Sequence, residues 1–498
     1  MKSLKPVGLI SLFYLGSRLI FFLAGVRLDL APLDFYMHYI DPELLKHNLV
    51  ESLFYLHSQP PLFNLFLGII LKLFPNHSQV VFSLCYLLFG LTLVISLFLL
   101  MSRLGINQKL ARILTILFMI SPAYILNENW LFYDYPVTSL LCLSSLFLFS
   151  FMRKNQLWQG GLFFTILAII CLTRSLFHLS YFIILITGLA WVQRFEYHQV
   201  RKLLLAALLP LSLIFLLFLK NYLVFGNFSA SSWLGFNLAK TTQHLLSDEE
   251  KATLVGQGKL SELTLIGPGF ISSPWRVNIN SLEKITPEYT YSPLTELKSI
   301  LPEYEKTGIP MLDEEYKSTG YVNYHHLAYQ DISKKLEQDA WYIIRIKPVA
   351  YLQGRFEALM SSWLRLNSDY LNKSWASKKN FAQVKPWQGF YTQYFCGRFL
   401  PFPVSIVFYL ILPFYGCYLI VRQQGSKVVN LPFVATIFFL VVNIFWVTLT
   451  SHLLVDNEQE RVRLLVEPFY LVLFGLLLQQ LFAAHPKKRL RRHKTTKR

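Results

Sequence analysis

The chain has 498 residues, of which 54% are hydrophobic, 16% aromatic and 15% charged. Soluble domains carry roughly 25% charged residues, so this composition excludes a soluble protein with a fully polar surface. The formal net charge of +18 does not by itself indicate nucleic-acid binding, because eight basic residues lie within the last twelve positions, directly after an apolar run. We expect this tail to be a cytoplasmic anchor against anionic lipid, with a nucleic-acid-binding or partner-binding tail as the alternative.

Apolar blocks of about twenty residues recur along the sequence and predict an all-α multi-pass membrane protein with about ten transmembrane helices. The first block, 7–26, is long for a signal peptide and ends without a small-residue cleavage site, so we expect a retained signal anchor. The five cysteines show neither metal-ligand spacing nor a disulfide framework. The predicted spans in chain order are 7–26, 79–101, 112–126, 135–152, 157–173, 177–194, 203–221, 401–421, 431–450 and 464–484.

An eleventh apolar run, 60–74, begins with two prolines and is short for a span. When the basic tail is placed inside and the ten longer runs alternate, the short inside loops carry Arg and Lys and the outside loops carry acids, as the positive-inside rule requires. A crossing by 60–74 would reverse these signs in the loops that follow. We therefore expect 60–74 to lie along the outer face or to dip into it.

The pattern predicts four parts. Between 222 and 400 the apolar density falls while charge, Pro, Gly, Tyr and Trp rise, which favours a folded extracytoplasmic block over a linker. The parts are an N-terminal membrane module at 1–221 with a juxtamembrane segment at 58–75, an extracytoplasmic loop domain at 222–400, C-terminal transmembrane helices at 401–484 and a basic cytoplasmic tail at 485–498.

The first outer loop holds acids close to the membrane surface. A carboxylate partly shielded from water has a raised pKa and can act as a general base, which makes Asp34, Asp41 and Glu43 catalytic candidates. Asp41 precedes Pro42, so a helix N-cap is the alternative reading of this residue. His57 and Gln59 stand just before the proline pair and are candidates for sugar or acceptor binding, although His57 could equally be an interfacial hydrogen-bonding residue.

The other outer loops add charged groups of both signs. Glu128 and Asp134 lie between two apolar spans, where ionisable groups are rare and usually functional, so they are further catalytic candidates. A helix cap or loop solvation is the alternative for either one. Arginine forks bind phosphate well, so Arg461 and Arg463 are candidate ligands of a lipid phosphate, or else partners of nearby acids such as Glu467. Arg174, at the outer end of the fifth span, could bind phosphate or snorkel. Arg18 lies near the middle of the first span and requires a partner or a cavity.

The large outer loop contributes polar and aromatic residues suited to a sugar or a lipid headgroup. These are Lys220, which we group with the phosphate ligands, and Trp233, Asn237, His325 and His326, which we group with acceptor or sugar binding. Aromatic rings stack on sugars, and Trp also favours membrane interfaces. No acid or cysteine stands at ligand spacing from the two histidines, so we expect no metal site.

Taken together, these residues resemble the GT-C superfamily of polytopic glycosyltransferases, which includes protein O-mannosyltransferases and aminoarabinose lipid A transferases. The resemblance lies in a first outer loop with an acid, here Asp41 or Asp34, followed by the segment HSQPPLFNLFLGI, in an acid of the second outer loop, and in the segment RVRLLVEP before a late span. It covers the first seven spans well and the C-terminal spans loosely. Asp41 and Glu43 are separated by Pro42, and Gln59 rather than His57 precedes the proline pair, which departs from the family pattern.

The resemblance implies an inverting transfer of a hexose-type sugar from a polyprenyl-phosphate donor to an acceptor at the outer or lumenal face. Asp41 would be the base, and Arg461 and Arg463 would hold the donor phosphate. The expected partners are membrane lipid, the lipid-linked sugar and an acceptor, with no nucleic acid and no required cofactor. The expected location is the bacterial inner membrane or the endoplasmic reticulum. A transporter or lipid flippase and a non-catalytic membrane scaffold are the alternatives; internally repeated halves would favour the first, and charged groups that lie far apart would favour the second.

Overall fold

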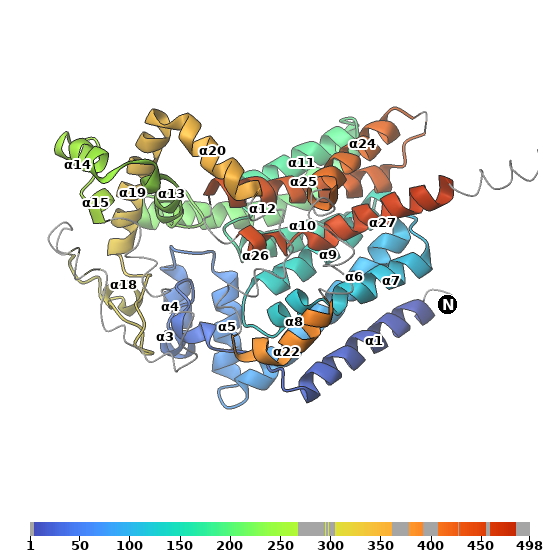
Figure 1. The fold of residues 1–498 in the computed structure, drawn as a ribbon, viewed down its shortest axis with the longest axis horizontal. Coiled ribbons are helices and arrows are strands. Elements are labelled where there is room, and N and C mark those ends of the chain that lie inside the picture. Colours follow the sequence, from blue (N-terminus) through green and yellow to red (C-terminus); the bar gives the residue numbers. More distant parts are fainter. Residues whose placement is uncertain are drawn as a thin grey trace, which may run out of the picture.

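A computed structural model describes residues 4–266, 294, 297, 304–360, 378–391, 407–426, 428–454 and 459–484. Within these residues the secondary structure is helical, and the only β contacts are two isolated bridges, Asp29 with Trp130 and Tyr316 with Val322. The prediction of an all-helical chain is confirmed for the described part. Figure 1 shows the long helices running side by side as a bundle, with a group of shorter helices at one end.

Among the described residues, five helices are long and apolar enough to cross a membrane. They are α1 (Leu4–Leu23), α6 (Ser78–Arg103), α9 (Asp134–Lys154), α12 (Tyr197–Phe225) and α25 (Leu431–Leu454). Many of their large apolar side chains face outward, as in Leu19, Leu84 and Leu209. An apolar outer surface of this kind requires an apolar solvent, so the chain is a helical membrane protein.

The run 112–126, predicted as one span, is divided in the structure. Helix α7 (Gln108–Met119) ends before Ser121, and α8 (Pro122–Glu128) continues at an angle of 60°. Proline disfavours the α conformation in the residue that precedes it, and Ser121 accordingly adopts an extended ψ of 130°. The pair forms a sixth span only if both helices are counted together.

Four apolar helices are shorter than a bilayer requires. They are α5 (Leu62–Leu73), α10 (Leu157–Cys171), α11 (Leu179–Val192) and α27 (Glu467–Ala484). At about 1.5 Å per residue a helix of fifteen residues is roughly 22 Å long, less than the hydrocarbon core of roughly 30 Å. A π-helical turn at Val407–Ile411 leads into α24 (Leu412–Gln424), which is also short. Helix length alone therefore supports five or six spans among the described residues.

Hydrogen bonds between connecting segments define two ends of the bundle. At one end, Gln479 of α27 donates to the Gly105 carbonyl in the turn after α6. At the same end, Arg194, just after α11, donates to the carbonyl of Gln424, the last residue of α24, at 2.9 Å. At the other end the Leu62 amide donates to the Leu172 carbonyl, and the bridge between Asp29 and Trp130 joins the first two outer loops. Figure 1 places the N-terminus and the end of α27 on the same side of the molecule.

The shorter helices at the far end form a unit with a core of its own. The unit comprises α13 (Leu234–Thr242), the 3-10 turn η1 (Gln243–Leu245), α14 (Asp248–Gly256), α15 (Leu263–Ile266), α18 (Pro310–Asp313), α19 (Ala328–Ile346) and α20 (Pro348–Ala358). Its core contains Trp233, Phe236, Tyr324 and Leu336. Helix α14 begins with a complete capping box at Ser247 and Glu250.

The predicted first outer loop forms three short helices, α2 (Pro32–Phe35), α3 (Pro42–His47) and α4 (Leu49–Phe54). Figure 1 shows α3 and α4 beside α5. Two further helices, α22 (Lys378–Tyr391) and α26 (Gln459–Arg463), pack against the same end of the bundle. Trp387 on α22 donates to the Ile120 carbonyl at 2.8 Å, at the break between α7 and α8.

Candidate functional site

Three charged side chains from separate parts of the chain meet at the start of α9. Asp134 is the first residue of α9, where the positive end of the helix dipole stabilises a carboxylate. Arg174, just beyond α10, forms an ion pair with its Oδ1, and Arg461 of α26 lies 3.5 Å from its Oδ2. All three side chains are buried. The loops after the third, fifth and ninth predicted spans therefore converge, and they bring an acid and two arginines together.

Aromatic rings enclose the two arginines. The Arg461 guanidinium lies 4.7 Å from the centre of the Phe132 ring, and the Arg174 guanidinium lies 5.2 Å from the Tyr133 ring. Cation–π contacts of this kind stabilise a positive charge that has lost its water. The rings also keep both guanidiniums in fixed positions.

A second layer of cationic groups lies next to Arg461, around His38 of the first outer loop. The His38 ring packs edge-on against Trp233 at 4.9 Å and against Tyr36 at 5.1 Å. Burial lowers the pKa of His38 well below its usual value, and the charges of His325, Arg461, Lys240 and Lys317 lower it further. His38 is therefore neutral at neutral pH, in a strongly positive environment.

Lys317 is a buried member of this group. Its ammonium donates to the Tyr36 carbonyl at 2.8 Å, and burial lowers its pKa to about 7, against the opposing effects of Asp41 and Asp34. A lysine with such a pKa exchanges its proton near neutral pH. Together His38, Lys240, Lys317 and Arg461 form what we call the cationic site.

Several buried polar atoms beside the cationic site lack a hydrogen-bond partner within the described part of the chain. They are Nδ1 of His38, Nε1 of Trp233 and Oη of Tyr324. Buried polar atoms in folded proteins are nearly always bonded to protein or water, so three of them in one neighbourhood indicate that water or a polar ligand completes the site. Trp233 links them, because its ring contacts both His38 and Tyr324.

Of the first-loop acids, Asp41 and Glu43 have structural partners. Asp41 caps α3 by accepting from the Glu43 amide at 2.9 Å, and it accepts from the Ser318 hydroxyl at 2.6 Å. Glu43 is exposed and pairs with Lys46 one helical turn on. Asp34 is the exposed acid beside Lys317. Partial burial raises its pKa while Lys317 lowers it, and Asp29 adds a smaller raising effect.

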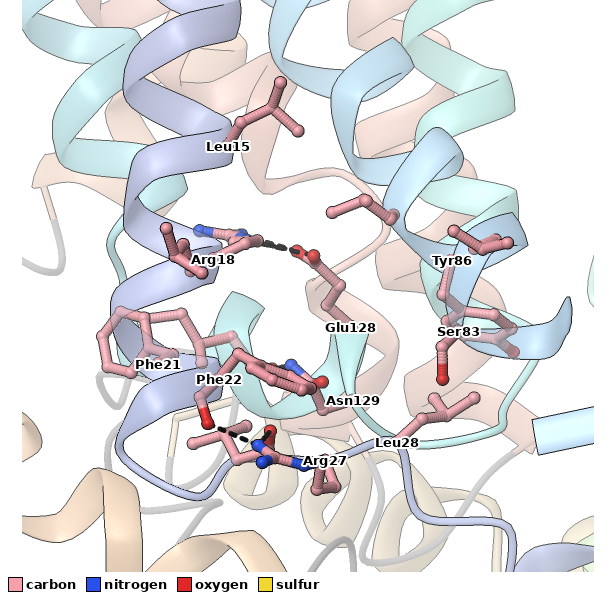
Figure 2. Close-up of a pocket in the computed structure, with 15 residues that line it drawn as sticks. Leu15, Arg18, Phe21, Phe22, Arg27, Leu28, Ser83, Tyr86, Glu128 and Asn129 are labelled. Atoms are coloured by element: carbon pink, nitrogen blue, oxygen red, sulfur yellow. Dashed lines mark hydrogen bonds and ion pairs between the residues drawn. The ribbon is translucent and has the colours of Figure 1, made fainter. Parts of the chain in front are cut away.

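Glu128 is buried at the end of α8, and Figure 2 shows its carboxylate facing Arg18 of α1. Its carboxylate accepts from Arg18 Nε at 2.9 Å, from Tyr14 at 2.7 Å and from Tyr135 at 2.6 Å. The requirement for a partner of Arg18 in the first span is therefore met by Glu128. Arg463 lies 3.6 Å from Glu467 and 4.2 Å from the centre of the Tyr409 ring. It therefore has the acidic partner that was the alternative to a lipid phosphate.

The residues predicted to bind sugar or acceptor fall into two groups. Trp233 belongs to the neighbourhood of the cationic site. His57 instead links the first loop to two segments of the large loop. Its Nδ1 lies 2.7 Å from the Ser232 hydroxyl, and its Nε2 lies 2.9 Å from the His325 carbonyl. Lys220, predicted as a phosphate ligand, donates to the Leu56 carbonyl at 2.8 Å, next to that junction.

The remaining residues that were predicted to bind sugar or acceptor are not part of the cationic site. Asn237 is half-buried on α13, Gln59 is buried beside His57, and His326 accepts from the Ala328 amide at 3.1 Å. No group of three potential metal ligands occurs among the described residues.

The sequence analysis missed His38, Lys240, Lys317 and Tyr324. Lys317 lies in a stretch with many other charged residues, whereas Lys240 follows Trp233 and Asn237 in a stretch with few charges. The positions of both lysines relative to His38 depend on how the unit of short helices docks. His38 could have been found from the sequence, because it lies close to Tyr36 and Tyr39 in the first acidic loop, which already held the catalytic candidates.

Comparison of the sequence with protein-family models finds no family that matches, and comparison with curated proteins finds no relative that matches.

Proposed function

We propose that the protein is a membrane glycosyltransferase that moves a hexose-type sugar from a polyprenyl-phosphate donor to an acceptor at the outer face. The observation that supports this most directly is the cationic site. The charges of Arg461, Lys317 and Lys240, which come from three separate segments, all lower the pKa of His38. A phosphate that carries negative charge fits such a site, and cations placed at a departing phosphate stabilise the transition state.

The rings around the cationic site suit a sugar. Trp233, Tyr36 and Tyr324 lie around His38, and aromatic faces stack on the C–H faces of sugars. The unpartnered Trp233 Nε1 and Tyr324 Oη supply donors for sugar hydroxyls. The donor would then lie with its phosphate towards Arg461 and its sugar against Trp233.

Asp34 is the acid best placed to serve as base in this proposal. It is exposed to an incoming acceptor, and its raised pKa makes it a stronger base than an ordinary aspartate. Asp34 would take the proton of the acceptor hydroxyl while the hydroxyl oxygen forms a bond to the anomeric carbon. The bond from that carbon to the phosphate oxygen breaks, and the polyprenyl phosphate leaves with the electron pair. Asp41, the first choice from sequence, would hold the loop through Ser318.

The proposal includes about ten membrane crossings, with this site on the extracytoplasmic side. In favour of it, the connections with basic residues gather at one end of the bundle, as the contacts of Gly105 and Arg194 indicate, and the acidic loops gather at the other. The short helices α10 and α11 would cross with help from polar and aromatic flanks, as short spans do.

The test uses the purified full chain and radiolabelled polyprenyl-phosphate sugars. We expect consumption of the lipid carrier by the wild type. Asp34→Asn should lower the rate by about a hundredfold or more, the usual contribution of a general base. Glu43→Gln is the matched control, because Glu43 is an exposed acid of the same loop.

A second pair of variants tests donor binding. Lys240→Gln should raise the apparent KM for the donor, while Lys334→Gln, an exposed change on α19, should leave it unchanged. Transport of the lipid across vesicles without cleavage of its sugar bond would favour a flippase instead. Wild-type rates in Asp34→Asn would remove Asp34 as base.

A further inference from the structure

A cavity of about 320 Å³ lies between α1, α6 and α8, away from the cationic site. Figure 2 shows α1 on one side with Leu15, Phe21 and Phe22, and α6 on the other with Ser83 and Tyr86. The volume corresponds to that of about ten liquid water molecules. Most of the lining is apolar, so water has few partners inside and a hydrocarbon chain is the better occupant.

The cavity opens towards the surroundings of the bundle. Leu19, Phe22 and Leu84 line it and are nevertheless 58%, 52% and 55% exposed. They lie on α1 and α6, two of the helices that are long enough to cross a membrane. The solvent in front of them is therefore lipid, and a lipid chain can enter from the side.

The charged groups on the inner wall of the cavity, Glu128 and Arg18, already have hydrogen-bond partners in the protein. Glu128 accepts hydrogen bonds from Arg18, Tyr14 and Tyr135, and the Arg18 Nη1 donates to the Met119 carbonyl at 2.7 Å. The charged pair is thus fully engaged within the bundle. A polar headgroup is not expected to bind there.

A different arginine stands at the outer rim. Arg27 follows the end of α1 by four residues, and its guanidinium lies 3.6 Å from the Phe22 ring. Its Nη1 donates to the carbonyls of Phe22 and Val26, whereas its Nε and Nη2 donate to no described residue. The twenty residues of α1 span about 30 Å, the thickness of the hydrocarbon core. Arg27 therefore lies at the level of the lipid phosphates.

We infer that this cavity binds one chain of an anionic glycerophospholipid whose phosphate is held by Arg27. Lipid tails are as apolar as the cavity wall, so moving a chain from the bilayer into the cavity gains little free energy. Selective binding must then come from the contact between the guanidinium and the phosphate. Asn380 of α22 fixes the Arg27 backbone through hydrogen bonds in both directions, at 3.0 and 2.6 Å, which holds the side chain at the rim.

The test is native mass spectrometry of the detergent-purified full chain titrated with phosphatidylglycerol, and with phosphatidylcholine as the zwitterionic comparison. We expect one tightly bound phosphatidylglycerol. Arg27→Gln should weaken it by about tenfold, the effect of losing one charge-assisted hydrogen bond, while Arg153→Gln, an exposed change at the other end of the bundle, should not. Phosphatidylcholine should bind both proteins equally weakly.

Occupancy of the cavity is tested by filling it. Ser83→Trp places an indole inside and should remove the bound phosphatidylglycerol, whereas Leu88→Trp, on the exposed face of α6 outside the cavity, should retain it. Retention in Ser83→Trp, or equal affinity in Arg27→Gln and wild type, would overturn the inference.

Two further titrations identify the source of the phosphate. Inorganic phosphate should not compete, because it has no chain. Polyprenyl phosphate has both a chain and a phosphate and is therefore the decisive competitor. If it displaces phosphatidylglycerol at equal concentration, the cavity belongs to the sugar carrier and the phospholipid assignment is wrong. All these measurements are of binding alone, so failure of the proposed glycosyl transfer leaves them unaffected.

Discussion

At the scale of single residues, several buried charges of the bundle have a partner of opposite charge on another helix. Glu128 on α8 is the clearest case, since α1 supplies Arg18 and Tyr14 and α9 supplies Tyr135. Gly90 on α6 makes room for this group, because a Cβ there would collide with the hydroxyls of Tyr14 and Tyr135. Four helices are thereby locked around one carboxylate.

Glu128→Gln should therefore destabilise the protein strongly. Removing one partner of a buried ion pair costs about 3–5 kcal/mol, because the remaining charge is left uncompensated. We expect a large decrease in the midpoint of thermal unfolding in detergent, and no decrease for the exposed change Glu51→Gln on α4. The double variant Arg18→Met, Glu128→Leu should regain much of the loss, because apolar pairs of similar size can replace buried ion pairs. A double variant less stable than Glu128→Gln would contradict this account.

His57 makes folding dependent on pH. Burial is the main cause that lowers its pKa from 6.5 to about 4, so between these values the unfolded chain binds a proton that the folded chain does not. Stability is then complete above pH 6.5 and falls as the pH decreases towards 4, by up to about 3 kcal/mol from this residue. His57→Gln should be less stable at pH 7.5 and should depend less on pH over this window. Unfolding midpoints measured at half-unit intervals check both effects, with exposed His47→Gln as the control.

At the scale of elements, helix ends and short helices position the residues of the site, and the long helices contribute less. Asp134 is positioned by the start of α9, and Arg461 by the five residues of α26. The unit of short helices contributes Trp233, Lys240 and Lys317. The packing within this unit depends on close contact between α13 and α19, where Gly235 lies against the Ser333 carbonyl.

Gly235→Ala should loosen this unit. The added Cβ would overlap the Ser333 carbonyl, a backbone atom that cannot rotate away, and such overpacking costs about 1–3 kcal/mol. Gly256→Ala is the control, because a Cβ at that helical position meets open space. Hydrogen exchange should become faster across α13 and α19 in the first variant only. Unchanged protection of α19 would show that the helices can separate at little cost.

The long elements were largely predictable from the sequence, and the site was predictable in part. Apolar blocks revealed the long helices, because a buried or lipid-facing helix leaves a strong local pattern. The break at Ser121 was missed because Pro122 was read inside a continuous apolar run. Placing both loops on one face put Asp134 and Arg461 on the same side, but their direct contact was not predicted. The positions of Lys317 and His38 could not be predicted, because they depend on contacts between segments about 280 residues apart, such as Lys317 with Tyr36.

At the scale of the whole molecule, the proposed crossings and the two ends of the bundle depend on one another. Ten crossings require the connections after α6, α9, α11 and α24 to share one side of the membrane with both termini. They require α13, α14 and α19 to lie on the other side. Five or six crossings would place at least one of these connections differently.

Labelling of single cysteines distinguishes the two arrangements. In a variant without its native cysteines, Thr253→Cys on α14 and Gln156→Cys before α10 introduce exposed thiols in the two regions. In intact bacterial cells that express the protein, we expect a membrane-impermeant maleimide to label position 253 but to reach position 156 only after the membrane is opened. The positive-inside distribution gives the same orientation, because Arg153 and Lys154 flank the second site and acids flank the first. Equal labelling of both positions in intact cells would exclude ten crossings and would separate the cationic site from the side on which a lipid-linked sugar is presented.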